Sequence, residues 1–185
     1  MRNFIFGVIF TLLLLAAGAL AFLLLGYMPT NADSKPPHME SRIANNALDA
    51  SMDRHAPRIT SPLPATDDNL IEGMKIYTMN CSGCHGTLDK KPSPQAHSFY
   101  PPPPQVILHP LDDPDWHIYY SIRTGIRYTA MPAWNTVLKE DEMWKVTLFL
   151  SHLEKLPAAV QDQWQKAYGA PAPSAPEGSS PQQEH

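Results

Sequence analysis

Both cysteines of the chain lie in the short segment NCSGCHG, residues 80–86, and a histidine follows the second one directly. Cys81, Cys84 and His85 form a C-x-x-C-H pattern, which brings two thiols and an imidazole close together. Such groups can bind a metal, form a disulfide or bond covalently to a cofactor. Each of these chemistries needs different support from the rest of the chain.

Three uses of this pattern, a zinc site, a redox dithiol and a structural disulfide, find little support. A structural zinc site usually needs four ligands, and the chain has no second cysteine pair. A redox dithiol of the thioredoxin kind expects a βαβ setting, and no strand pattern is visible. A disulfide between Cys81 and Cys84 would close too small a loop to stabilise the fold much, and it would leave His85 without a role.

The pattern instead indicates covalent attachment of a c-type haem. In that arrangement Cys81 and Cys84 bond to the two vinyl groups along one edge of the porphyrin. His85 follows immediately, so its imidazole can turn under the ring and bind the iron. We therefore predict one covalently bound haem c with His85 as the proximal axial ligand.

The second axial ligand is a separate inference. Met131 lies in the loop GIRYTAMPAW, where Pro132 keeps the backbone extended. A thioether opposite the proximal histidine gives Met/His ligation, which raises the reduction potential and suits electron transfer. We predict this role for Met131; the alternatives are a surface loop residue there, or ligation by His97, His109 or His117. The other methionines are assigned to the N-terminal run, the linker or helix packing: Met1, Met28, Met39, Met52, Met74, Met79 and Met143.

Three residues in or beside this loop could contact the haem. Arg123 and Arg127 flank the loop, and each could either bond a haem propionate or be solvated. Trp134 follows the Met-Pro pair, and its large apolar ring is expected to pack against the haem edge.

The N-terminal run, residues 4–28, carries no charged side chain. A membrane-spanning helix needs about 20 apolar residues, and this run is long enough. We favour a retained anchor over a cleaved signal peptide, because the apolar run continues beyond the small-residue site at residues 19–21. Arg2 precedes the run and the next cation is Lys35, which predicts a cytoplasmic N-terminus and export of the rest.

The chain divides by composition into four parts. Residues 1–28 are the anchor, and residues 29–65 are a proline-rich linker with one possible short helix. Residues 66–160 are the folded domain, and residues 161–185 are a mostly disordered tail in which residues 161–168 could prolong a helix. Within the domain, apolar spacing predicts three helices, over residues 66–80, 113–125 and 138–157. Twenty prolines exclude much further regular structure, and the segment between the first two helices must be a loop.

Composition also bears on the partners. The formal net charge is −4 and no run of Lys or Arg occurs, so nucleic acid is excluded as an expected partner. The size of the folded segment points to a cofactor. The segment is small and has little apolar surface to bury, which suggests that a cofactor fills part of its core.

The segments GMKIYTMNCSGCHG, SIRTGIRYTAMPAW and DEMWKVTLFLSHL together resemble a class I cytochrome c. More narrowly, they are similar to the monohaem domains of cbb3-type oxidase cytochrome subunits and of membrane-anchored bacterial cytochromes. The resemblance implies an all-α fold with an N-terminal transmembrane helix, in which the first and last helices of the domain cross beside the haem. It implies Gly73 and Tyr77 at the crossing, Trp144 as the aromatic residue facing them, and Met131 as the distal ligand.

Two departures from the family pattern stand out. Lys139 occupies a position where the family often has a Ser or Thr helix cap, so that helix is expected to begin less firmly. The loop over residues 90–110 contains YPPPP, which is richer in proline than the family's usual haem-lining pair.

These features predict a membrane-tethered electron carrier, not an enzyme, in the cytoplasmic membrane of a bacterium with its haem domain in the periplasm. Its partners would be redox proteins: a quinol-oxidising complex, an oxidase or a soluble cytochrome. The alternative is a fixed haem subunit of a quinol-oxidising or terminal oxidase complex. A haem-based sensor ranks third, because it requires a labile or absent methionine ligand.

Overall fold

The computed structural model describes residues 1–169. Over these residues the chain forms seven α-helices and three short 3₁₀ turns, with no strand. It divides into two compact units, Met1–Ala32 and Asp33–His185. The all-α class predicted from the sequence, with an apolar helix at the N-terminus, is confirmed.

The first unit contains one apolar helix, α1, over Arg2–Leu24. Residues Asn3–Leu24 have a mean hydropathy of 2.6, and at 1.5 Å per residue they are long enough to cross the hydrocarbon layer of a bilayer. The large apolar side chains along the helix are exposed. A signal sequence has the same length and character, so this helix fits either the anchor or the leader.

The segment predicted as a linker contains an 18-residue helix, α2, over His38–His55. The helix extends well beyond the expected short one because no proline lies between Pro37, its N-cap, and Pro57. Met52 is buried within it, and Ala56 directly after it is buried too.

Two contacts tie α2 and its flanking residues to the rest of the second unit. Glu40 accepts a hydrogen bond of 2.5 Å from the Tyr100 hydroxyl in the proline-rich loop. The Arg58 guanidinium lies over the ring of Trp116, 5.3 Å from its centroid. Much of residues 29–65 is therefore ordered against the domain.

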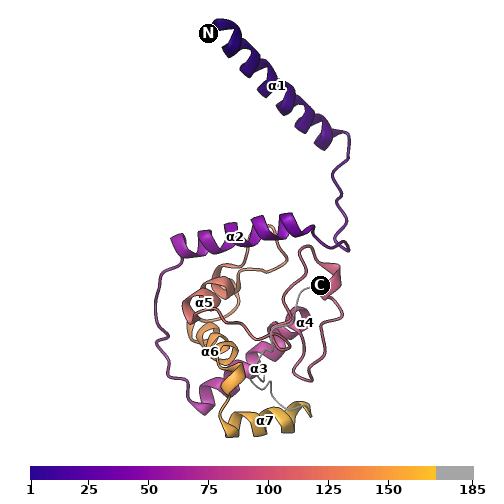
Figure 1. The fold of residues 1–185 in the computed structure, drawn as a ribbon. Helices are drawn as coiled ribbons and strands as arrows, with labels where there is room; N and C mark the ends of the chain where they lie inside the picture. Colours follow the sequence, from indigo (N-terminus) through magenta and orange to yellow (C-terminus); the bar gives the residue numbers. More distant parts are fainter. Residues whose placement is uncertain (170–185) are drawn as a thin grey trace, which may run out of the picture. The chain divides into compact units, whose positions relative to one another are not determined.

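The core of the second unit is built around the packing of α3, Asp67–Asn80, against α6, Glu140–Ser151 (Figure 1). Helix α3 begins at Thr66, whose hydroxyl accepts from the Asn69 N–H, and its first turn carries two aspartates that suit the helix dipole. The predicted close approach at Gly73 is confirmed. A Cβ atom there would lie 2.1 Å from the Lys145 carbonyl oxygen, so only glycine fits.

The aromatic packing at this crossing differs from the expectation. The ring facing Tyr77 is Phe149, with centroids 5.9 Å apart. Trp144 instead stacks on Tyr119 of α5, Asp115–Thr124, at 3.9 Å and nearly parallel. Both of those rings are fully buried, so Trp144 joins α6 to α5 and Phe149 joins α6 to α3.

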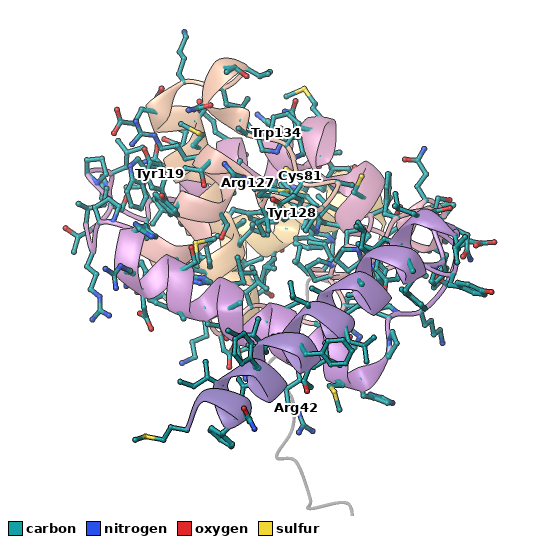
Figure 2. The ribbon with its side chains drawn as sticks, turned by 90° about the horizontal axis from the view of Figure 1, so that it is seen from above. Arg42, Cys81, Tyr119, Arg127, Tyr128 and Trp134 are labelled. Atoms are coloured by element: carbon teal, nitrogen blue, oxygen red, sulfur yellow. The ribbon has the colours of Figure 1, made fainter. Side chains whose placement is uncertain are left out.

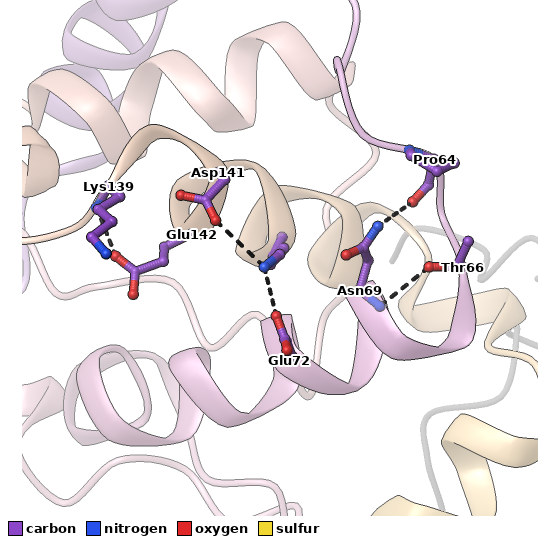
Figure 3. A network of polar contacts seen from close by, with 8 residues as sticks. Pro64, Thr66, Asn69, Glu72, Lys139, Asp141 and Glu142 are labelled. Carbon is purple, nitrogen blue, oxygen red and sulfur yellow. Dashed lines mark hydrogen bonds and ion pairs between the residues drawn. The ribbon is translucent and has the colours of Figure 1, made fainter.

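Charged groups bridge the same crossing on its solvent side (Figure 3). Lys145 of α6 contacts Glu72 of α3 at 2.6 Å, and the Glu72 carboxylate raises the pKa of this amine. At the start of α6, the Lys139 side chain has no hydrogen-bond acceptor with which to cap the helix. Glu142 supplies half of a capping box by accepting from the Lys139 backbone N–H at 2.7 Å.

The domain ends later than predicted. Helix α6 ends at Ser151 rather than near Pro157, and a 3₁₀ turn, Leu153–Lys155, leads to a further helix, α7, over Ala158–Tyr168. Val160 and Trp164 of α7 are fully buried, and Trp164 Nε1 donates to the Leu88 carbonyl at 2.8 Å. Residues 161–168, for which the sequence left open a helix at the start of the mostly disordered tail, are helical and complete the core. The rest of the predicted tail, residues 170–185, lies outside the described residues.

We expect Gly73→Ala to destabilise the second unit by about 1–3 kcal/mol or more, because the added methyl group meets backbone atoms of α6 that cannot move aside cheaply. Guanidinium unfolding of the purified protein, followed by circular dichroism, measures the effect. Gly83→Ala is the matched control, since a Cβ there meets nothing within 4 Å. Equal stability of the two variants would contradict the close crossing.

Candidate functional site

The C-x-x-C-H motif forms one helical turn at the end of α3. Cys81 is the C-cap of α3 and the N-cap of a four-residue helix, α4, over Ser82–His85. The Cys84 and His85 backbone N–H groups both donate to the Cys81 carbonyl, at 3.1 and 2.9 Å. Residues three apart in such a turn share a face, which brings the two thiols to the same side. Both are free and half-buried.

The imidazole of His85 is held in a defined orientation. Its Nδ1 lies 2.8 Å from the Pro104 carbonyl oxygen, which can only accept, so Nδ1 carries the proton and Nε2 keeps its lone pair. Burial lowers the pKa of His85, while the bond to Pro104 acts in the opposite direction. A neutral imidazole with Nε2 available is the form that ligates iron.

The thiol of Cys81 sits in an apolar setting. Burial, followed by the neighbouring Cys84, raises the pKa of Cys81 to about 12. Cys81 packs at the margin of the main core cluster, together with Met131 and Trp134. The structure therefore brings residues from the two halves of the predicted site onto one core.

The loop that follows the motif is tied back to the helices at two points. Gly86 adopts a φ of 97°, and its carbonyl accepts a 2.7 Å hydrogen bond from the Tyr77 hydroxyl of α3. Burial raises the pKa of Tyr77, so its phenol stays protonated as the donor. Two residues later, the Leu88 carbonyl accepts from Trp164 of α7. The position of the motif is therefore fixed by α3 and α7 together.

Two further residues, Ser93 and Gln105, hold the backbone of the motif. The Ser93 hydroxyl donates to the Gly83 carbonyl, and Gln105 Nε2 donates to the Cys84 carbonyl at 2.9 Å. Sequence reasoning missed both. Ser93 between two prolines carries no chemical signal, while the place of Gln105 directly after the four prolines is the only hint.

The Met131 loop is closed by short-range bonds. The Ile126 N–H donates to the Met131 carbonyl at 3.2 Å, and the Thr129 hydroxyl accepts from the Met131 N–H at 3.1 Å. Gly125 has a φ of 65°, and a Cβ there would lie 2.6–2.7 Å from backbone atoms of residues 131–133. The loop thus packs tightly on the end of α5, and the half-buried Met131 side chain rests on the core.

The other candidates lie in different settings. His97 and His109 are exposed, and His117 lies 3.2 Å from Asp113, which favours an anchoring role for it. Arg123 and Arg127 are exposed, as is Tyr128, at 90%. Figure 2 labels Arg127 and Tyr128 with Cys81 and Trp134, which project to the same region of that view.

Four other methionines differ in how far their side chains are buried. Met74 and Met143 are buried in the core, as predicted. Met79, which was assigned to packing, is 74% exposed. Met52, which was assigned to the linker, is buried.

These residues fit a c-type haem. Free thiols on one face of a turn, a neutral imidazole with Nε2 available and a half-buried thioether on the same core form the donor set that this group needs. When bound, the haem supplies one-electron redox chemistry at its iron.

Comparison with known proteins finds a family model that matches the central part of the chain. Residues 68–150 match the family model described as cytochrome c oxidase, cbb3-type, subunit III. No curated protein was similar enough to count as a match. The matched range runs from the first turn of α3 through the motif, α5 and Met131 to Leu150 of α6, and it leaves out α1, α2 and α7. This family implies haem c binding and a role in electron transfer, and the match supports a cbb3-type cytochrome c domain over residues 68–150 of this chain.

Proposed function

We propose that this chain is a single-haem c-type cytochrome that transfers electrons between respiratory partners. Cys81 and Cys84 hold the haem through thioethers, and His85 and Met131 are its axial ligands. The observation that carries the proposal is the Nδ1 contact of His85 with the Pro104 carbonyl, directly behind two free thiols. That contact leaves Nε2 as the one imidazole nitrogen able to bind iron.

The residues around the site suit an electron carrier rather than a catalyst. His85 and Met131 fill both axial positions, so no position stays open for a substrate. The hydrogen bonds to Pro104 and within the Met131 loop hold both side chains in place, which limits rearrangement when the charge of the site changes. The protein's part is therefore orientation and tuning of the potential.

We further propose that α1 is a retained anchor that tethers the haem domain to the outer face of the cytoplasmic membrane. The length and apolar character of α1 support an anchor, and the single cation before it supports a cytoplasmic N-terminus. The tether confines diffusion to the membrane plane and raises the effective concentration near partner complexes.

A second candidate is a fixed haem subunit of an oxidase or quinol-oxidising complex. The matched family model describes an oxidase subunit, which favours this role. The small residues at positions 16–19 of α1 would allow close packing against other helices. Sizing after mild detergent extraction separates the two: a free carrier migrates alone, and a subunit migrates with a large complex.

The covalent attachment gives the first test of this function. Haem should stay with the polypeptide through acid-acetone extraction and denaturing electrophoresis, because two thioether bonds hold it. The double variant Cys81→Ser, Cys84→Ser should lose this haem, and Ser82→Ala in the same turn should keep it. Haem that resists extraction in the double variant would rule out thioether attachment.

The location gives a second test. Protease added to intact spheroplasts should cut within residues 25–37, the mostly exposed segment between α1 and α2, and release a soluble haem domain. Release only from inside-out vesicles would mean that the orientation is reversed. A mature protein that begins near Phe22 would mean that α1 is a cleaved leader.

The sixth ligand gives a third test. A thioether favours ferrous iron more than an imidazole does, so Met131→His should lower the reduction potential while the iron stays six-coordinate. Met131→Ala should open the site, shift the spectrum towards high spin and let the ferrous protein bind carbon monoxide. Both are measured by spectroelectrochemistry and optical titration.

The buried Met143 provides the matched control, because Met143→Leu should change neither property. The unaltered ferric protein should also show the weak long-wavelength band of sulfur-to-iron charge transfer. Absence of that band, together with ready carbon monoxide binding, would argue for a sensor instead of a carrier.

A further inference from the structure

A pair of polar side chains connects the motif to the proline-rich loop. Ser93 is 2% exposed, and its hydroxyl donates to the Gly83 carbonyl. Its backbone N–H donates to Gln105 Oε1 at 2.7 Å. We call Ser93 and Gln105 the proximal clamp. The clamp joins Ser93, which lies 10 positions after Gly83, to Gln105, which lies 12 positions further along the loop.

Gln105 uses both ends of its amide. While Oε1 accepts from Ser93, Nε2 donates to the Cys84 carbonyl at 2.9 Å and to the Pro103 carbonyl at 3.0 Å. Cys84 is the residue before His85, and Pro103 is the residue before Pro104. The amide therefore bridges the same two backbone segments that the contact between His85 Nδ1 and the Pro104 carbonyl joins at 2.8 Å.

This bridge limits how far the two segments can separate. The four-residue helix α4 leaves its last carbonyls without helical partners, and the clamp satisfies two of them, those of Gly83 and Cys84. Gly86 packs against the same amide, since a Cβ there would lie 3.3 Å from Gln105 Oε1. Without Gln105, the bond between His85 and Pro104 would be the hydrogen bond left between these two segments, while Val106 and Ile107 keep the following part of the loop packed in the core.

The hydrogen bond on Nδ1 affects what Nε2 does. A partner that accepts a hydrogen bond from the ring N–H makes a ligating imidazole a stronger electron donor. A stronger donor favours ferric iron. The geometry of the bond between His85 and Pro104 therefore helps to set the reduction potential of a bound haem.

We infer that Gln105, supported by Ser93, is a positioning residue that holds the Pro104 carbonyl against His85 and thereby keeps the reduction potential low. The inference rests on the proposed haem attachment at Cys81, Cys84 and His85. It assigns a role in tuning to side chains that touch neither the iron nor its ligating atoms.

The test uses the full-length haem-loaded protein after haem retention on denaturing gels has been verified. A protein without covalent haem would contradict the proposed function before this question arises. Gln105→Met keeps the approximate length of the side chain and removes its hydrogen bonds. Ser93→Ala removes the bond to the Gly83 carbonyl. Each is compared with the unaltered protein by spectroelectrochemical titration and by the exchange rate of the His85 Nδ1 proton in the ferrous state.

We expect Gln105→Met to raise the reduction potential and to speed exchange of the Nδ1 proton, and Ser93→Ala to move both in the same direction by less. Gln95→Met is the matched control, because Gln95 lies exposed in the same loop and its side chain makes no bond to the motif. Val160→Ala, which removes buried volume in α7, is the control for lost stability alone.

Three results would overturn the inference. One is a Gln105→Met protein whose potential and exchange rate equal those of the unaltered protein. Another is a shift that Val160→Ala reproduces at equal loss of stability, because the effect would then come from loosening of the fold. The third is loss of haem from both Gln105→Met and Ser93→Ala, which would make the clamp a requirement for folding rather than for positioning.

Discussion

The close crossing of α3 and α6 at Gly73 is the constraint on which the site depends. Because a Cβ at Gly73 would lie 2.1 Å from a backbone oxygen of α6, any larger residue there would push the two helices apart. Tyr77 lies one turn further along α3, and its hydroxyl reaches the carbonyl of Gly86 just beyond the motif. The crossing thus fixes the end of α3, and the end of α3 fixes where the two cysteines and His85 stand.

A small all-helical unit with a long proline-rich loop needs additional anchors, and aromatic side chains provide them. Phe149 packs against Tyr77 on one side and against Trp164 on the other, with centroids 5.9 and 5.8 Å apart. Trp164 in turn donates a hydrogen bond from its Nε1–H to the Leu88 carbonyl. One row of rings therefore runs from the helix crossing to the loop behind the motif. Helix α7, although it lies outside the matched range, is part of what holds that loop.

The sequence predicted those parts of the fold that rest on local chemistry. Thr66 with two aspartates indicated the start of α3, and C-x-x-C-H together with Met131-Pro132 gave the candidate ligands. It could not predict Trp164, because burial of a lone aromatic residue depends on contact with Leu88, 76 positions away. The same holds for Ser93 and Gln105, whose bonds follow no helical or strand period. Helix α2 was underestimated because its polar surface gives a weak apolar pattern.

The two sides of the candidate site are held by bonds of different reach. On the His85 side, the bonds from His85, Gln105 and Trp164 join residues 19, 21 and 76 positions apart. On the Met131 side, the loop is closed by hydroxyl bonds of Thr129 that span two and three positions.

Bonds that link distant segments are lost only when those segments separate, whereas a local turn can open by itself. The Met131 loop also holds Tyr128 at a φ of 63°, a conformation that costs a non-glycine residue about 1 kcal/mol or more. Lys90, in the loop behind the motif, has a similar φ of 60°, so what distinguishes the two sides is the reach of their hydrogen bonds. Those around His85 join distant segments, while the Met131 loop relies on local bonds and on the close packing of Gly125 against residues 131–133.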